Sequence, residues 1–316
     1  MLDSVSLDQL RAFIAAADAG SFSAAARTLR RAQSVVSQTI SNLEGQIGVS
    51  LFDRSLRSPR LTPEGIVLLA DARMIAAGVD SLKARAKGMA GGLEPELSVV
   101  IDVMFPMVAI TEAAKAFSLQ FPGTPLRLYV EALGGTIQPV LDGRCGLGIV
   151  GSLPTIPPAL AVERLSAVVL LMVAAREHPL AAISGVIPKT ELTQHVQLVL
   201  TDRSELSAGR EFGVMSPNTW RFADLGAKHA FLLNGLGWGS MPLLAIHQDI
   251  ASGRLVELLV EDGPKGGFVM PMSAVYPSGA PPGPAGRWLI ERLKQCPEAQ
   301  ARASADAMRA VPMIPT

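Results

Sequence analysis

Residues 20–44 read GSFSAAARTLRRAQSVVSQTISNLE, and this stretch decides how the N-terminal part of the chain folds. Its second half begins a run of apolar residues at helical spacing: Val36, Ile40, Leu43 and Ile47. This run predicts a helix, which we expect to end at Gly48 because glycine favours the left-handed conformation found after helices. In the first half, Ser23 is expected to cap a shorter helix. The stretch therefore predicts two helices joined by a tight turn.

The flanking residues complete a small domain. Upstream, Ser6 and Gln9 have the spacing of a capping box, so a further helix is expected to start there. Downstream, helical periodicity stops around Ser58-Pro59, which predicts two short strands joined by a turn between Leu51 and Leu61. Three helices followed by such a wing predict a winged helix-turn-helix domain over residues 1–62.

The outward face of the helix around Val36 carries short polar side chains. In a helix-turn-helix the second helix places its N-terminal turns in the major groove, where such side chains contact base edges. The residues left for this role are Gln33, Ser34, Ser37 and Gln38. Nearby arginines are expected to contact phosphates or enter the minor groove, namely Arg27, Arg30, Arg31, Arg54, Arg57 and Arg60. The alternative is that this face is only the solvated surface of a small helical domain.

Two residues depart from an ideal recognition helix. Ala32 stands where a capping serine or threonine would be expected, so the helix start lacks a side-chain cap. Gly45 lies inside the helix, where glycine costs about 1 kcal/mol relative to alanine. We expect softer last turns but no loss of DNA binding.

A long helix should follow the wing. Thr62, Pro63 and Glu64 supply an N-cap, a proline at the first helical position and an acid for the helix dipole. The expected linker segment is 63–92, which ends at the hinge Gly91-Gly92. One stripe of this helix mixes small, apolar and charged residues and is predicted to pack against a partner helix: Ile66, Leu69, Ala70, Arg73, Ala76, Ala77, Asp80 and Lys83.

Beyond Leu97, segments of strand length alternate with helical patterns. The expected strands are 97–101, 126–130, 147–150, 168–174, 196–200, 255–259 and 269–275. Alternation with helices predicts a parallel sheet with crossover helices, and the pattern occurs twice. We therefore expect a two-lobed α/β domain over 93–296, with lobe I at about 93–165 and 269–296 and lobe II at about 166–268. Residues 297–316 are expected to form a flexible tail.

Length and composition restrict the class of protein. The 316 residues exceed the ~150 typical of one domain, and a hydrophobic fraction of 49% favours globular domains over disorder. Lys plus Arg and Asp plus Glu balance at 28 each, so DNA contacts must come from local clustering of charge. No basic region precedes an apolar segment at the N-terminus, and the longest apolar run, 167–175, is too short to span a bilayer. We expect a cytoplasmic protein with no membrane partner.

Residues suited to catalysis or metal binding are sparse. Cys145 and Cys296 are the only cysteines, and neither has a second Cys or His at ligand spacing, so we expect no metal and no cofactor. No acid–base pair is found, so we expect that the protein is not an enzyme. Arg144 beside Cys145 raises the hypothesis of a redox-sensitive thiol, which the lack of a nearby resolving cysteine disfavours.

The chain resembles the LysR-type transcriptional regulators. The N-terminal match is dense and includes Gly20-Ser21-Phe22, Ala25-Ala26, Val36-Ser37-Gln38, Leu51-Phe52-Asp53-Arg54 and Leu61-Thr62-Pro63-Glu64-Gly65. Looser matches follow, such as Phe121-Pro122, His178-Pro179-Leu180 and Gly253-Arg254-Leu255. The resemblance implies a homodimer through the linker helix, commonly assembled into a homotetramer. It also implies promoter DNA as partner and a small-molecule effector bound in a periplasmic-binding-protein-like effector domain.

The resemblance also points to a cleft beyond the strand ends, where open α/β sheets bind ligands. The corresponding residues here are Asp102, Val103, Met104, Phe105, Gly134, Gly135, Thr136, Thr201, Asp202, Thr219 and Trp220. Asp102 would repel a carboxylate, so we expect a neutral, phenolic or cationic effector. For each of these residues, packing or hinge structure is the alternative role.

Two other classes of function remain open. A solute-binding protein or an enzyme on the same two-lobed scaffold has no use for the polar helix face and its arginines. An effector-independent DNA-binding repressor would have a vestigial cleft. A ligand-dependent change in the DNA footprint separates that last case from a sensor.

Overall fold

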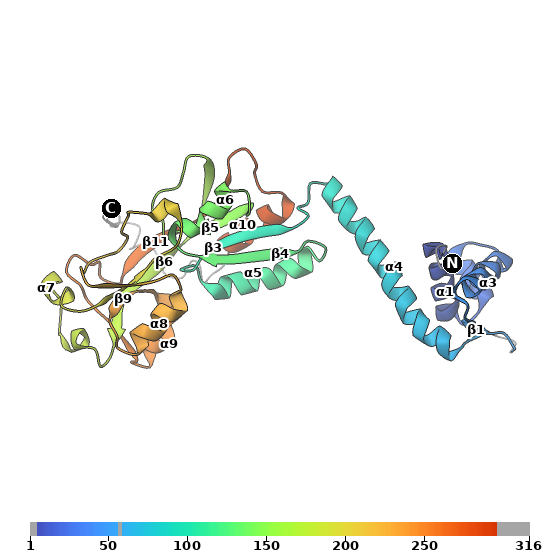
Figure 1. Ribbon diagram of the computed structural model, residues 1–316, viewed down its shortest axis with the longest axis horizontal. Helices are drawn as coiled ribbons and strands as arrows, with labels where there is room; N and C mark the ends of the chain where they lie inside the picture. Colours follow the sequence, from blue (N-terminus) through green and yellow to red (C-terminus); the bar gives the residue numbers. More distant parts are fainter. Residues whose placement is uncertain (1–4, 56–58, 296–316) are drawn as a thin grey trace. The chain divides into compact units, whose positions relative to one another are not determined.

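The computed structural model describes residues 5–55 and 59–295, so the predicted flexible tail at 297–316 lies outside the described residues. By their contacts the residues form two compact units, Met1–Gly91 and Gly92–Thr316. Figure 1 labels many of the elements of both units, and each unit is described by itself below.

The first unit is a helical head with a small wing. Its elements are α1 (Leu7–Ala19), α2 (Phe22–Leu29), α3 (Gln33–Ile47), β1 (Phe52–Asp53), β2 (Arg60–Leu61) and α4 (Pro63–Ala90). The capping box of Ser6 and Gln9 is confirmed at the start of α1. The N-cap of α2 is Ser21, whose hydroxyl accepts from the Ala24 amide, so the prediction of Ser23 was wrong by two residues. The expected helices and wing are therefore present.

The core of the head lies between the helices and the wing. Phe52 of β1 meets the rings of Phe13 and Phe22 edge to face, at centroid distances of 5.7 and 5.2 Å. Val36, Ile40 and Leu43 are buried in the same cluster, as their spacing predicts. Edge-to-face contacts add to the burial of apolar area and hold the wing against the helices.

The long helix α4 uses part of the predicted stripe for a contact within the head. Leu69 and Ala76 are buried, and α4 packs against α1 of the same head. Two ion pairs join the same helices, Arg11 with Asp80 and Arg73 with Asp18. The helix α1 is thus one partner of the stripe, of which Ile66, Ala70 and Ala77 stay exposed. A stripe of helical spacing identifies a packing face without naming its partner.

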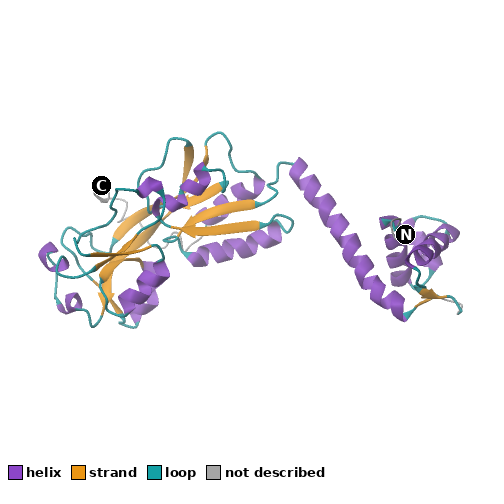
Figure 2. Ribbon diagram, viewed as in Figure 1, coloured by secondary structure: helices purple, strands orange, loops and turns teal. Residues whose placement is uncertain are grey.

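The second unit is built on one nine-stranded sheet, shown in orange in Figure 2. Its strands are β3 (Leu97–Asp102), β4 (Leu126–Glu131), β5 (Leu147–Val150), β6 (Leu160–Ala175), β7 (Gln197–Leu200), β8 (Thr219–Phe222), β9 (Trp238–Pro242), β10 (Leu255–Glu257) and β11 (Phe268–Pro277). Its α-helices are α5 (Met107–Gln120), α6 (Gln138–Leu141), α7 (Lys189–Leu192), α8 (Leu225–Leu233), α9 (Leu243–Ala251) and α10 (Pro284–Lys294). We call the part around β3–β5 lobe I and the part around β7–β9 lobe II.

The sheet is parallel only within each lobe. β3 pairs in parallel with β4 and β5, and β7 pairs in parallel with β8 and β9. Between them run β6 and β11, which pair antiparallel with each other and pass through both lobes. The register of this pair shifts between Met272 and Ser273. The expectation of two all-parallel sheets is therefore corrected to one mixed sheet, joined by two long antiparallel strands.

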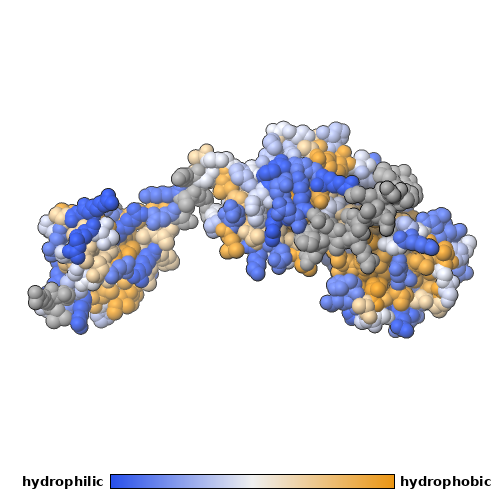
Figure 3. All heavy atoms as spheres, turned by 180° about the vertical axis from the view of Figure 1, so that it is seen from behind, coloured by the Kyte–Doolittle hydropathy of each residue, from blue (hydrophilic) through white to orange (hydrophobic). Residues whose placement is uncertain are grey.

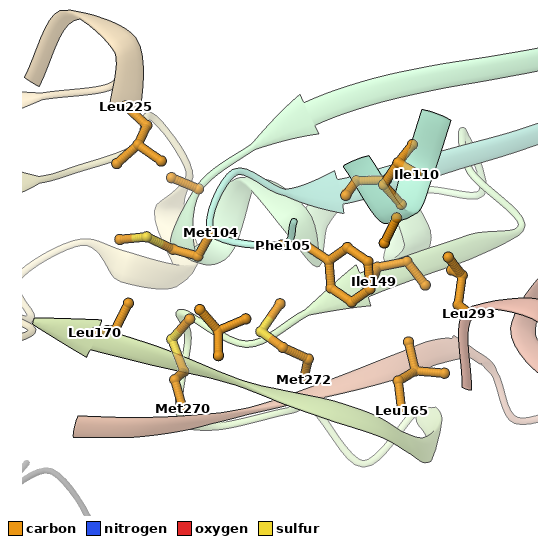
Figure 4. Close-up of a cluster of buried hydrophobic side chains, with 14 of the residues drawn as sticks. Met104, Phe105, Ile110, Ile149, Leu165, Leu170, Leu225, Met270, Met272 and Leu293 are labelled. Carbon is orange, nitrogen blue, oxygen red and sulfur yellow. The ribbon is translucent and has the colours of Figure 1, made fainter. Parts of the chain in front are cut away.

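A shared hydrophobic core connects the lobes. Figure 4 shows Met104, Met270 and Met272 gathered with Leu170 and Leu225 in one cluster of buried side chains, drawn from both lobes. Methionine is flexible and fills irregular gaps, so this part of the core tolerates small rearrangements. Apolar side chains also reach the surface, where Figure 3 shows them as orange patches among polar residues.

Candidate nucleic-acid interface and effector cleft

The N-terminal turns of α3 present the predicted polar face. Gln33, Ser34 and Gln38 are exposed and Ser37 is partly exposed, while Val36 is buried. No side chain caps the start of α3, as the alanine at its N-cap position predicts. The amides and hydroxyls of this face are therefore available to base edges, with one restriction. Gln38 Nε2 donates to Asn42 Oδ1 at 2.9 Å and must exchange this bond to reach a base.

Sequence reasoning missed Val35 on the same face. Its side chain is 48% exposed, although α3 buries the neighbouring Val36. An exposed apolar group on a recognition helix is suited to contact the methyl group of thymine. The signal was available, because successive residues of a helix are about 100° apart, which places Val35 to the side of the face that Val36 buries.

Two of the five described arginines already form ion pairs within the head. Arg31 donates to Asp8 Oδ2 at 2.7 Å, and this bond lowers the pKa of Asp8. Arg54 donates to Glu44 Oε2 at 2.7 Å, with its guanidinium 5.4 Å from the centre of the Phe22 ring. These arginines lie near α3, but a phosphate contact would have to compete with an existing carboxylate.

Glu44 has a role that the sequence did not indicate. Besides pairing with Arg54, its Oε1 accepts from the backbone amides of Leu51 and Phe52 at 2.8 and 3.1 Å. The carboxylate thus joins the last turns of α3 to the first strand of the wing. Charge-assisted bonds of this kind fix the wing relative to the recognition helix.

The other arginines are freer. Arg27, Arg30 and Arg60 are exposed and form no ion pair with any residue that the structure describes. Arg30 ends α2 in the left-handed region at φ 54°, which turns the chain toward α3. Arg57 lies outside the described residues. Unpaired guanidinium groups at the ends of a recognition unit are suited to phosphate contacts.

The predicted cleft residues divide between two pockets of the second unit. An apolar pocket of about 450 Å³ is lined by Val103, Met104 and Phe105 from lobe I and by Leu225, Pro242 and Leu244 from lobe II. A polar pocket of about 350 Å³ is lined by Gly135, Thr201 and Asp202, together with charged residues such as Arg203. Residues of the β3–α5 loop therefore line the apolar pocket, and residues that follow β4 and β7 line the polar pocket.

Asp102 faces neither pocket, and the argument that it repels an effector is corrected. The residue is fully buried, and its Oδ2 accepts from the Gly151 amide and from the amide and hydroxyl of Ser152 at 3.1, 2.7 and 2.6 Å. Its Oδ1 accepts from the Met104 amide at 3.0 Å. Burial raises the pKa of Asp102, and these hydrogen bonds oppose the rise. The carboxylate shapes the loop after β3 from inside the protein.

Two further predicted residues lie away from the pockets. Thr136 is fully buried, and its hydroxyl donates to the Leu133 carbonyl oxygen at 2.7 Å. Trp220 is 43% exposed on β8 and meets the Phe231 ring edge to face at 6.2 Å. Thr219 lines a third pocket, on lobe II. Strand ends were located correctly, but the direction of each side chain depends on packing between the lobes.

Other chemistry finds little support in the part of the chain that is described. Cys145 is buried, and burial raises the pKa of its thiol, with Arg144 acting in the opposite direction. A raised pKa disfavours the reactive thiolate that a redox sensor needs. No cluster of three potential metal ligands is found among the described residues. No described helix is long and apolar enough to cross a membrane.

A winged helix-turn-helix head and a two-lobed α/β domain with pockets at its strand ends define a class of protein, the ligand-sensing DNA-binding regulators. Residues 7–66 match the model of the bacterial regulatory helix-turn-helix proteins of the lysR family, and residues 90–296 match the LysR substrate binding domain. The chain belongs to the LysR family of transcriptional regulators, and this prediction from the sequence is confirmed.

Curated relatives align over most of the chain. The HTH-type transcriptional activator AllS of Klebsiella pneumoniae is 28% identical over 260 residues, which cover 79% of this chain and 93% of that protein. The HTH-type transcriptional regulator AceR of Acinetobacter baumannii is 28% identical over 238 residues, which cover 75% and 79% of the two chains. In fold, the chain is similar to a mutant of OxyR from Corynebacterium glutamicum, with a TM-score of 0.58, 22% identity and 98% coverage of both chains.

Proposed function

We propose that this LysR-family regulator reads promoter DNA through the N-terminal turns of α3 and that an effector bound between the lobes alters this binding. The observation that carries the DNA-reading role is the exposed polar face of α3 beside unpaired arginines. Its relatives are named as transcriptional regulators, and we propose that this chain likewise acts on chromosomal DNA in the cytoplasm without catalysing a reaction.

The polar residues of α3 and the arginines have different roles in DNA binding, because their side chains differ. Gln33, Ser34, Ser37 and Gln38 offer donors and acceptors that distinguish bases in the major groove. Arg27, Arg30 and Arg60 offer charge, which attracts any duplex equally. We assign Arg31 and Arg54 a supporting role, because Asp8 and Glu44 already hold them in place.

A binding experiment separates the two groups. Gln33→Ala and Ser37→Ala are expected to weaken binding to the protein's own upstream intergenic DNA by about 1–3 kcal/mol, with little change on random duplex. Arg30→Ala is expected to weaken both and to reduce the dependence of affinity on salt. Fluorescence anisotropy with labelled duplexes at several salt concentrations measures these effects.

Gln248→Ala serves as the control, because Gln248 is an exposed glutamine on α9 of the other unit. It is expected to bind both duplexes like the wild type. Equal losses on cognate and random DNA for Gln33→Ala would overturn the base-reading assignment. A wild-type protein that ignores its own upstream DNA at low salt would overturn the function as a whole.

For the effector, we propose a neutral and largely apolar molecule in the apolar pocket. The volume of about 450 Å³ lies within the range typical of small-molecule sites, and residues from both lobes line the pocket. A molecule that touches both lobes changes the balance between their arrangements, which is the requirement for a sensor. Of the neutral, phenolic or cationic effectors expected from the sequence, the neutral and phenolic ones are kept and the cationic one is not, on the basis of the apolar pocket lining and no longer of Asp102.

We also propose a homodimer, assembled further into a tetramer, with α4 as one contact. Ile75, Leu82 and Met89 are exposed on α4 and lie seven residues apart. Apolar residues at heptad spacing are typical of paired helices. This row differs from the stripe of α4 that packs on α1, so one helix can serve both contacts.

A further inference from the structure

Asp202, which follows β7 in lobe II, forms a hydrogen bond with lobe I. Asp202 Oδ2 accepts from the backbone amide of Gly135 in lobe I at 2.8 Å. Within lobe II the same carboxylate accepts from the hydroxyls of Ser204, at 2.7 Å, and Ser207. A weaker bond comes from the Ser204 amide at 3.4 Å.

The backbone around Gly135 is shaped for this contact. A Cβ atom at Gly134 would overlap Ser204 Oγ and lie 2.8 Å from Leu206 Cβ and 3.2 Å from Asp202 Oδ2. Glycine is therefore needed for lobe I to approach the segment after β7 this closely. At Gly134 the two lobes meet through backbone and short polar side chains, and this contact borders the polar pocket.

Apolar contacts hold the same segment of lobe II on lobe I. Leu206 packs against a cluster that includes Val100 and Ile137, all of whose buried members belong to lobe I. Phe212 packs against the same cluster. Part of the connection between β7 and β8 thus packs on lobe I, and Asp202 is a charged residue at its start.

We propose that Asp202 is a specificity-determining residue of the effector cleft, because its own carboxylate occupies the donors that an effector's carboxylate would need. Ligands of open α/β sheets bind beyond the carboxyl ends of the strands, and Asp202 and Gly135 follow the ends of the parallel strands β7 and β4. A second anion at this place would meet like charge and find the Gly135 amide already used. Asp202 therefore excludes a carboxylate effector from the Gly135 amide at this edge of the polar pocket, and it holds the lobes together.

This inference rests on the proposed function, because it names a class of effector that the sensor does not bind. The bond itself is tested on the full-length protein without DNA. Removal of the side chain in Asp202→Ala should free the Gly135 amide and leave space for formate, which has the carboxylate of the missing side chain. Hydrogen–deuterium exchange of the segment 131–138 reports on that amide, and the thermal midpoint reports on the contact between the lobes.

In Asp202→Ala, exchange of this segment is expected to accelerate roughly tenfold or more, since a charge-assisted hydrogen bond is lost. Formate should slow the exchange again and raise the thermal midpoint, whereas formamide, a neutral molecule of similar shape, and chloride at equal ionic strength should not. The wild type should not respond to formate. Asp202→Asn should not respond either, because its side chain still fills the space.

Glu205→Ala is the matched control, because Glu205 is an exposed acid in the same segment. Its exchange should equal that of the wild type, with or without formate. If Asp202→Ala does not fold, Asp202→Ser leaves nearly the same space and takes its place. Equal effects of formate and formamide, or tight binding of a small carboxylate at this place in the wild type, would overturn the proposal while leaving DNA binding untouched.

Discussion

At the scale of single residues, Lys228 is unusual because a basic side chain is buried. It is buried on α8, and its ammonium group donates to the Ser240 carbonyl oxygen at 2.7 Å. No carboxylate lies within ion-pair distance of it in the described part of the chain, and burial lowers its pKa to about 7. A buried charge without a partner costs free energy unless it loses its proton.

The sign of the pH effect follows from linkage. The unfolded chain holds the Lys228 proton up to about pH 10.4, whereas the folded chain releases it near pH 7. Between these values the unfolded state binds more protons, so this residue's penalty on stability is full below about pH 7 and decreases as the pH rises.

Lys228→Met is therefore expected to raise the free energy of unfolding at pH 6 by roughly 2–4 kcal/mol, net of the lost hydrogen bond. The gain should be clearly smaller at pH 9. Urea unfolding at both pH values measures it, with Lys115→Met as control, since Lys115 is exposed on α5 of the same unit. A gain that does not depend on pH would show that the charge of Lys228 is not the cause.

At the scale of elements, two glycines of the head differ in what surrounds them. A Cβ atom at Gly45, inside α3, would have nothing within 4 Å. At Gly65, near the start of α4, it would overlap the Leu51 carbonyl oxygen and lie 3.0 Å from the Leu51 carbonyl carbon. The first glycine only adds flexibility to a helix, and the second permits the close approach of α4 to the wing.

Alanine is expected to change the free energy of unfolding in opposite directions at these two positions. Gly45→Ala should raise the free energy of unfolding of the head by about 0.5–1 kcal/mol, because alanine loses less backbone entropy in a helix. Gly65→Ala should lower it by about 1–3 kcal/mol, because the wing must move to admit a methyl group. Thermal unfolding monitored by circular dichroism tests both. A stabilising Gly65→Ala would contradict the packing of α4 on the wing.

At the scale of the whole molecule, assembly sets how strongly the regulator binds. Two linked DNA-binding heads bind two half-sites with an avidity that one head lacks. The row of Ile75, Leu82 and Met89 on α4 is the proposed contact, and Leu82 is 66% exposed in the single chain.

Leu82→Glu is expected to shift the protein toward monomer, because burying a carboxylate between helices is costly. DNA affinity should fall with it, typically by tenfold or more. Analytical ultracentrifugation measures the mass. Val186→Glu is the control, since Val186 is a comparably exposed apolar residue on the other unit, 63% exposed. If Leu82→Glu sediments like the wild type, the contact lies elsewhere.

The sequence by itself determined the features that depend on neighbours along the chain. The capping box at Ser6, the periodicity of α3 and the alternation of strands and helices all arise from interactions over a few residues, and these patterns predicted most elements. The family was predicted from the resemblance of short motifs such as Leu61-Thr62-Pro63-Glu64-Gly65. Short elements without strong periodicity were missed, as β8 and β9 show.

Only the tertiary structure decided which group each side chain meets. Arg54 and Glu44 are ten residues apart, and Asp202 and Gly135 are 67 residues apart. Asp102 and Asp202 are both acids at the end of a strand. The first accepts four hydrogen bonds inside lobe I, whereas the second accepts a hydrogen bond from the other lobe. Hydrogen bonds and burial depend on positions in space, so the contacts between residues distant in sequence are determined only once the chain has packed.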